Sequence, residues 1–114
     1  MYAQITYFDG PRSAELVAAG ERAGRERIEP AMLADPVMQA AHISTLVLRQ
    51  PDGSEVVVVV TDTSEALDHG CEIIMSTQLL PGEDPALLPG PTRVERYQVV
   101  AMTERGKILE VASA

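Results

Sequence analysis

A run of five valines, Val56 to Val60, restricts the fold of this 114-residue chain more than any other feature of its sequence. Valine favours strands because its branched Cβ packs well on a pleated surface. Successive side chains of a strand point to opposite faces, so this strand is apolar on both of them. We therefore expect an internal strand that needs an apolar cover on each side.

The segments around the valines predict a hairpin and a helix. "HISTLVLRQ" (residues 42–50) indicates a strand, and "PDG" (residues 51–53) favours a tight turn, because proline presets φ at about −65° and glycine accepts a positive φ. The two strands are thus expected to be antiparallel neighbours. The word "DTSE" (residues 62–65) predicts a helix N-cap with Glu65 in a capping box, and this helix is expected to end before Pro81.

The N-terminal part predicts a strand followed by an amphipathic helix. Tyr2 to Phe8 is rich in aromatic and β-branched residues and precedes a turn cluster, "DGPRS". Ser13 is placed as an N-cap, and apolar residues recur after it at steps of three and four. Gly20 and Gly24 lie within this apolar stripe, where either a close helix contact or a kink accounts for them.

Prolines mark most of the remaining boundaries. Pro30 predicts a bend or a new first helical turn, and "LADP" (residues 33–36) predicts the end of the first helical stretch. "PGEDPALLPGPT" (residues 81–92) is expected to be a loop, either a flap or a spacer, and "RVERYQVVAM" (residues 93–102) a fourth strand. We expect one domain over residues 1–104 and a tail over residues 105–114, which either adds a short strand or is loose.

The order of these elements, β-α-β-β-α-β, predicts an α+β fold of the ferredoxin-like type. In that arrangement a four-stranded antiparallel sheet has both helices on one face. No segment of the chain is left to cover the other face of the valine strand. We therefore expect the bare face to pack against a second sheet, supplied by a second copy of the chain in a two-fold homodimer.

Charge and composition exclude several classes of partner. Nine basic residues against 17 acidic ones give a net charge of −8, which repels nucleic acid and anionic membranes. The apolar runs are far shorter than the roughly 20 residues that cross a bilayer, and the N-terminus lacks the basic start of a signal peptide. The single cysteine, Cys71, can form no internal disulfide. These features together predict a cytoplasmic protein.

Several segments in this order resemble the dimeric α/β-barrel family, and within it the branch named after antibiotic-biosynthesis monooxygenases. The segments are "MYAQITYF", a helix ending "IEPAMLADP", the hairpin, "VVVTDTSEAL" and "RVERYQVV", and the resemblance covers about residues 2–100. It implies two ferredoxin-like subunits packed sheet against sheet, with a ligand cleft between the sheet and the helices of each. Members of the family oxidise polyaromatic phenols without a cofactor, degrade haem or isomerise small acids.

The chain departs from that family at the catalytic positions. The oxidising and haem-degrading members rely on an asparagine with a tryptophan, plus a tyrosine or histidine, and this sequence contains no asparagine and no tryptophan. No flavin, iron or haem role carries over, and we expect no cofactor. A metal site is not expected either, because His69 and Cys71 lie two positions apart on a helix and point to different sides.

Five residues are the candidates for a site. Tyr97 and His42 are the candidate catalytic residues, Tyr97 as a hydrogen-bond donor to a ligand oxygen and His42 as a base or a haem ligand. Tyr7 is a second donor, and Met32 and Met75 are candidates to line an adaptable pocket. The more frequent alternatives are a packed tyrosine with its hydroxyl at the rim, an exposed histidine, and methionines that fill gaps in the core.

The sequence thus predicts a homodimer that binds a small hydrophobic or aromatic molecule and has no assigned catalysis. The alternative is a cofactor-independent monooxygenase or isomerase acting on an aromatic or polyketide-like substrate. Neither nucleic acid nor a membrane is expected as a partner. Whether the protein is an enzyme is left open at this level, since one fold hosts many activities.

Overall fold

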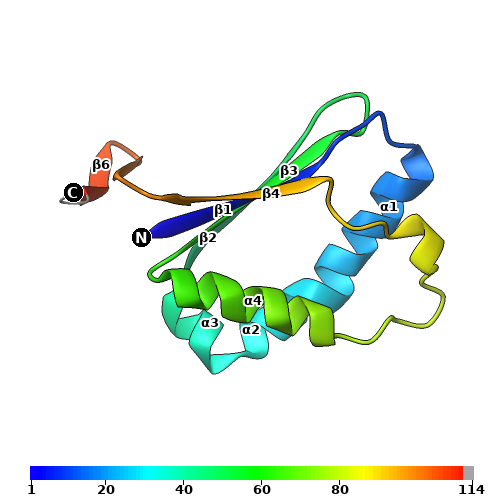
Figure 1. The fold of residues 1–114 in the computed structure, drawn as a ribbon, viewed down its shortest axis with the longest axis horizontal. Helices are drawn as coiled ribbons and strands as arrows, with labels where there is room; N and C mark the ends of the chain where they lie inside the picture. The colour runs from blue at the N-terminus through cyan, green and yellow to red at the C-terminus, as the bar shows by residue number, and fades with distance from the viewer. Residues whose placement is uncertain (112–114) are drawn as a thin grey trace.

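The computed structural model of the protein describes residues 1–111. Four strands form an antiparallel sheet in the order β2-β3-β1-β4, so that β3 and β1 are internal and β2 and β4 are its edges (Figure 1). The strands are β1 (Tyr2–Phe8), β2 (His42–Arg49), β3 (Glu55–Thr61) and β4 (Arg93–Gln98). The valine run is therefore an internal strand, as its composition predicts.

The described helices all lie on one face of this sheet (Figure 1). Between β1 and β2 they are α1 (Ala14–Arg22), the π-helical η1 (Ala23–Ile28), α2 (Glu29–Ala34) and α3 (Pro36–Ala41). Between β3 and β4 they are α4 (Ser64–Ser76) and the 3₁₀ turn η2 (Pro85–Leu87). An α+β fold with a four-stranded antiparallel sheet is thus confirmed. It is compatible with a ferredoxin-like arrangement, in a loose form because the first crossover is divided into four helical segments.

Side-chain caps begin the two main helices where the sequence predicts them. The Ser13 hydroxyl accepts a hydrogen bond from the Leu16 backbone N–H at 3.2 Å, and the Thr63 hydroxyl accepts one from Ala66 at 3.2 Å. These bonds satisfy helix-terminal N–H groups that have no partner within the helix. The predicted capping box is wrong, since the position three residues after the cap is Ala66 and not Glu65.

The first helical stretch ends at Ala34, within "LADP" as predicted, but the helix that follows it directly was not predicted. Asp35 leaves the helical conformation but caps a further helix, α3, by accepting hydrogen bonds from Val37 at 3.0 Å and Met38 at 3.1 Å. Proline is well suited to the first helical turn, where its missing N–H is not needed. Pro30 lies in the first turn of α2, directly after the π-helical η1 and in a helical run that continues from α1 without a break.

Glycines allow close approach at two positions. A Cβ on Gly70 of α4 would lie 3.0 Å from the Met32 Cε and 3.4 Å from the Met38 Cε, so this helix packs tightly against α2 and α3. Gly53 has a φ of 89°, and a Cβ there would overlap the Arg12 carbonyl oxygen. Gly24 has no atom within 4 Å of an added Cβ and lies in the π-helix η1, which favours the distorted helix over a close contact.

The strand register assigns each valine to a face. Gln4 of β1 donates a hydrogen bond to the Cys71 Sγ of α4 at 3.4 Å, so Gln4 faces the helices. Val59 is directly opposite Gln4, and residues opposite one another share a face of the sheet. Hence alternate valines of β3 face the helices, and the others face away. We call the second side the open face; it includes Ile5, Tyr7, Leu46, Leu48, Val56, Val58, Arg93, Glu95 and Tyr97.

Few apolar side chains of the described residues are buried. Among residues 1–106, whose side chains the structure describes, the buried apolar residues are Ala23, Met38, Val60, Ala66 and Leu67. The chain exposes 7450 Å², whereas a compact monomer of 12.3 kDa exposes about 6,100 Å². Several large apolar side chains, among them Leu46, Val47 and Leu48, are more than half exposed.

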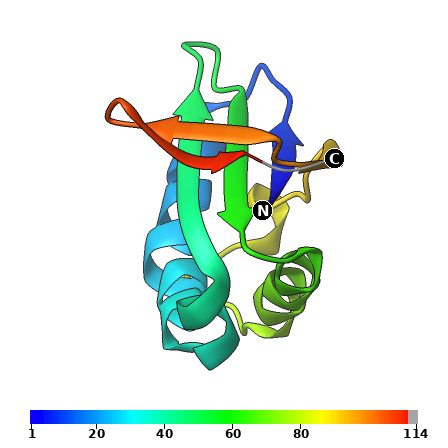
Figure 2. The same cartoon turned by 90° about the vertical axis from the view of Figure 1, so that its left-hand side faces the viewer.

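A second, two-stranded sheet follows β4. It consists of β5 (Ala101–Glu104) and β6 (Lys107–Val111), and β6 occupies the part of the tail for which a short strand was one of two alternatives. This hairpin lies on the side of the molecule away from the helices (Figure 1), and in the view of Figure 2 it passes in front of β2 and β3. The hairpin contributes to a radius of gyration of 15.0 Å, compared with about 13 Å for a compact chain of this length. None of the described helices is long and apolar enough to span a membrane.

Candidate functional site

Two of the predicted site residues meet on the open face. Tyr7 of β1 is opposite Arg93 of β4, and Ala3 is opposite Tyr97. Glu95 lies between these positions on β4 and points to the same side, because residues two apart in a strand share a face. We call Tyr7, Arg93, Glu95 and Tyr97 the tyrosine–glutamate cluster.

Glu95 is the centre of the cluster. The Tyr97 hydroxyl donates a hydrogen bond to the Glu95 Oε2 at 3.1 Å, and the Arg93 Nη1 lies 3.6 Å from the Glu95 Oε1. The Arg93 guanidinium also lies over the Tyr7 ring, 3.7 Å from its centroid, in a cation–π contact. One carboxylate, one guanidinium and two phenol groups thus share a small area of the sheet surface.

The charges of the cluster determine what its phenols can do. Hydrogen bonding to Glu95 raises the pKa of Tyr7 and the pKa of Tyr97, because a phenolate beside a carboxylate is disfavoured. The hydrogen bonds from Tyr7 and Tyr97 lower the pKa of Glu95, and the bond from Tyr7 has the larger effect. At neutral pH the cluster therefore presents an anionic carboxylate and two neutral hydroxyl groups. Such groups donate and accept hydrogen bonds, and the tyrosines are poor bases.

The helix-facing side of β4 holds a different set of contacts. Arg96 donates hydrogen bonds to the Asp68 Oδ1 of α4 at 2.6 Å and to the Gln4 Oε1 at 2.7 Å. Gln4 in turn contacts Cys71. This chain of polar contacts fills the space between sheet and helix at the level of β4. The family resemblance implies a ligand cleft between sheet and helices, but Tyr7 and Tyr97 point to the other face of the sheet.

The other three predicted site residues lie elsewhere. His42 begins β2, at the edge opposite β4, and its Nε2 lies 2.7 Å from the Thr45 hydroxyl. Met32 packs against Gly70 between α2 and α4. Met75, at the end of α4, is 85% exposed. None of the three is on the open face beside the tyrosines.

One polar pair was not foreseen from the sequence. The His69 Nε2 on α4 lies 2.9 Å and 3.0 Å from the two carboxylate oxygens of Asp35. The only local signal was Asp35 before Pro36, which indicates an N-cap and not a partner on another helix. Among the described residues, no group of three or more His, Cys, Asp or Glu side chains could hold a metal ion.

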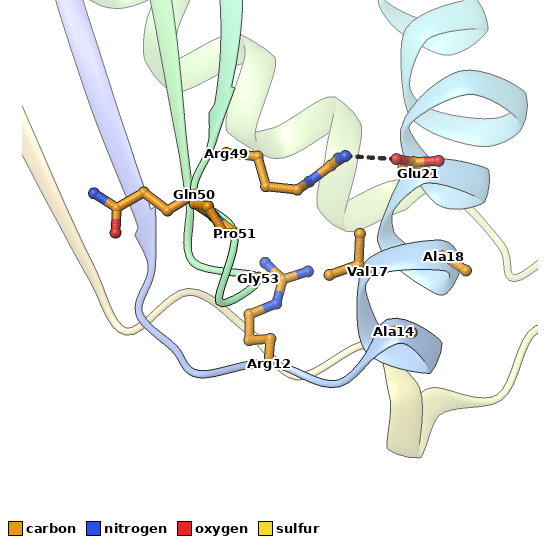
Figure 3. Close-up of a pocket in the computed structure, with 9 residues that line it drawn as sticks. All are labelled: Arg12, Ala14, Val17, Ala18, Glu21, Arg49, Gln50, Pro51 and Gly53. Carbon is orange, nitrogen blue, oxygen red and sulfur yellow. Dashed lines mark ion pairs between the residues drawn. The ribbon is translucent and has the colours of Figure 1, made fainter.

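A shallow pocket of about 320 Å³ lies between α1 and the β2–β3 turn (Figure 3). The Arg12 and Arg49 guanidinium groups point toward it, and the Arg49 Nη1 pairs with the Glu21 Oε1 at 2.7 Å. Glu55 lies beside both arginines, 3.7 Å from Arg12 and 2.7 Å from Arg49. Two cations are therefore balanced by two anions, which gives the pocket little net attraction for a charged ligand.

Comparisons with known proteins identify no family for this chain. No family model matches it, and no curated protein or solved structure matches it either. The four-stranded antiparallel sheet with helices on one face is the part of the expected architecture that the structure shows.

Proposed function

We propose that the protein forms a two-fold dimer through its open face and binds a small hydrophobic or aromatic molecule between the two sheets. The observation that carries this proposal is the tyrosine–glutamate cluster, which stands at the border of an otherwise apolar sheet face. Such a dimer corresponds to the dimeric α/β barrels that the sequence resembles. The ligand would lie on the open face, and not in the cleft between sheet and helices that the resemblance implies.

The apolar part of the open face supports the contact between subunits. Leu46 and Leu48 of β2 are more than half exposed, and Ile5, Val56 and Val58 continue the same apolar surface. Large apolar areas of this kind mark interaction surfaces on soluble proteins. The chain also exposes 7450 Å², roughly a fifth more than a compact monomer of its size, and a standard interface covers about 800 Å² on each partner.

The cluster supports the binding of an aromatic molecule that carries hydroxyl or carbonyl groups. Glu95 accepts hydrogen bonds, the Tyr7 and Tyr97 hydroxyl groups donate them, and the ring of Tyr7 and the guanidinium of Arg93 offer flat surfaces for stacking. A second sheet above the cluster would exclude water and strengthen these hydrogen bonds. Binding pockets are typically apolar with a few placed polar groups of this type.

The same groups favour binding over acid–base catalysis. The raised pKa values of Tyr7 and Tyr97 keep both phenols protonated at neutral pH, and the lowered pKa of Glu95 makes it a weak base. The alternative activity, a cofactor-independent monooxygenase or isomerase, would use Tyr97 and Glu95 to hold a phenolic substrate. Oxygen uptake or isomerisation in the presence of such a compound, lost in Tyr97→Phe, would support that alternative.

Binding of a small hydroxyanthraquinone, measured by calorimetry, tests the proposed site. Glu95→Gln and Tyr97→Phe are expected to weaken binding by about tenfold each, which corresponds to about 1.4 kcal/mol. Tyr2→Phe is the matched control, because Tyr2 is on the same sheet but shares a face with Gln4, on the helix side. Equal affinity in all four proteins, or equal loss in all three variants, would contradict the proposal.

The subunit contact is tested separately by light scattering. Ile5→Glu introduces a charge at the centre of the open face and is expected to abolish the sheet-to-sheet contact. The variant should keep the circular dichroism of the wild type, since Ile5 is not part of the buried core. An unchanged molar mass in this variant would overturn the sheet-to-sheet dimer.

A further inference from the structure

Three consecutive apolar residues at the edge of the sheet are exposed, and the open-face dimer covers only two of them. Leu46, Val47 and Leu48 of β2 are 56%, 57% and 51% exposed. Leu46 and Leu48 belong to the open face, but Val47 is opposite Val57 and points to the helix side. A partner that covers Val47 as well must approach the edge of β2 and not only its face.

The backbone of the same strand is available for pairing. The Gln50 N–H donates to the Ser54 carbonyl at 2.9 Å, which directs the backbone groups of Gln50 toward β3. In an antiparallel pair this direction alternates along the strand. Leu48 and Leu46 therefore also bond to β3, while Thr45, Val47 and Arg49 direct their N–H and C=O groups away from it. These groups lie on the edge of the four-stranded sheet, where β2 has no neighbour beyond β3.

The exposed apolar side chains of β2 and its outward-directed backbone groups are both arranged symmetrically about Val47. We propose that β2 pairs with β2 of a second copy, antiparallel, about a two-fold axis at Val47. Val47 would exchange both backbone hydrogen bonds with Val47 of the second copy, and Thr45 would do so with Arg49, giving about six bonds. Leu46 would lie beside Leu48 of the second copy on the open face. All three exposed apolar residues would then be covered by one contact.

The two edges of the sheet differ in how they are protected. Exposed edges are normally guarded by charges, prolines or bulges, because free backbone groups pair readily with other strands. The β4 edge carries Arg93, Glu95 and Arg96. In β2 the only irregularity is the register shift between His42 and Ser44, and Arg49 at the other end is held by Glu21 and Glu55. Residues 45–48 therefore have no charge, proline or bulge that would prevent pairing with another strand.

A second copy of this chain fits the edge better than an unrelated strand does. Leu46 and Leu48 lie on either side of Val47, through which the two-fold axis passes. The apolar side chains and free backbone groups of one copy therefore meet the same groups of the other. The edge contact stands independently of the open-face dimer, because Val47 takes no part in the latter.

The two contacts predict different assemblies. With both, the wild type is a tetramer in which continuous eight-stranded sheets pack face to face. Ile5→Glu then leaves a dimer joined through β2, whereas a variant of the edge leaves a dimer joined through the open face. Failure of one contact is thus distinguishable from failure of the other.

The edge contact is tested by Val47→Lys against Val94→Lys. Val94 is the matched control: it lies in the same row across the sheet, on the same side, is 50% exposed, and belongs to the opposite edge strand. Light scattering should show that Val47→Lys halves the molar mass or raises the dissociation constant on the order of tenfold or more, and that Val94→Lys has no effect. A lysine at an exposed edge position reaches solvent, so the fold should be kept.

A cross-link gives a second measurement. In a Cys71→Ser background, Val47→Cys should form a covalent dimer on mild oxidation, because paired Cα atoms about 5.5 Å apart lie within the range of a disulfide. Val94→Cys in the same background should remain uncross-linked. A wild-type monomer, an unchanged mass in Val47→Lys, or equal cross-linking at both positions would overturn the proposal.

Discussion

The imidazole of His69 lies 2.9 Å from the carboxylate of Asp35, and this pair joins α4 to the junction between α2 and α3. The same carboxylate accepts the backbone N–H groups of Val37 and Met38, so it begins α3 as well. One side chain thereby positions three helices on the face of the sheet. Its charge is therefore expected to matter for the stability of the whole helical layer.

The stability of the protein should fall on acidification through Asp35. Hydrogen bonding to His69 lowers the pKa of Asp35 below its ordinary value of 3.8. The folded state then binds fewer protons than the unfolded state, so the contribution is complete above about pH 4 and is lost as the pH falls through the lowered pKa. Asp35→Asn keeps the N-cap but removes the charge. In this variant the urea concentration at the unfolding midpoint should depend less on pH than in the wild type. In a His69→Gln background the same change should have a smaller effect; equal effects in both backgrounds would exclude this pair as the cause.

Tyrosine titration should report the contact with Glu95. Because the carboxylate raises the pKa of Tyr7 and Tyr97, Glu95→Gln should move the phenolate absorbance change to lower pH. Glu72→Gln, an exposed position on α4, is the control and should leave the titration unchanged. If both variants titrate like the wild type, the tyrosine–glutamate cluster does not form in solution.

Met38 should contribute much more to stability than Met75. The Met38 side chain is 2% exposed and lies against Gly70 of α4, whereas Met75 is 85% exposed. Met38→Ala leaves a cavity and should lower the free energy of unfolding by about 3 kcal/mol. Met75→Ala should change it by less than about 0.5 kcal/mol. A loss for Met75→Ala similar to that for Met38→Ala would mean that Met75 is covered in the assembly.

Gly53 should not tolerate a side chain. Its φ of 89° is unfavourable for other residues, and an added Cβ would overlap the Arg12 carbonyl oxygen. Gly53→Ala is expected to lower the free energy of unfolding by about 1–3 kcal/mol. Gly90→Ala, where no atom lies within 4 Å, should be neutral within about 0.5 kcal/mol. Thermal unfolding of the two variants provides the comparison.

The strands and helix starts could be predicted because their signals are local. The valine run, the turn at Gly53 and the caps at Ser13 and Thr63 each depend on residues within a few positions of one another. The same local reasoning predicted the end of α2 at "LADP" but not the start of α3, because Asp35 stops one helix and starts the next. A cap residue marks a boundary, but it does not say whether another helix follows.

The amino-acid sequence by itself determined that β3 is a strand with apolar side chains on both of its faces. Only the tertiary structure decided that Tyr97 meets Glu95 and Tyr7 on the open face, that His69 meets Asp35, and that Val47 is exposed at the edge of the sheet. The reason is that strand register, strand order and helix packing join residues far apart in the chain, and a shift of one residue would reverse every face.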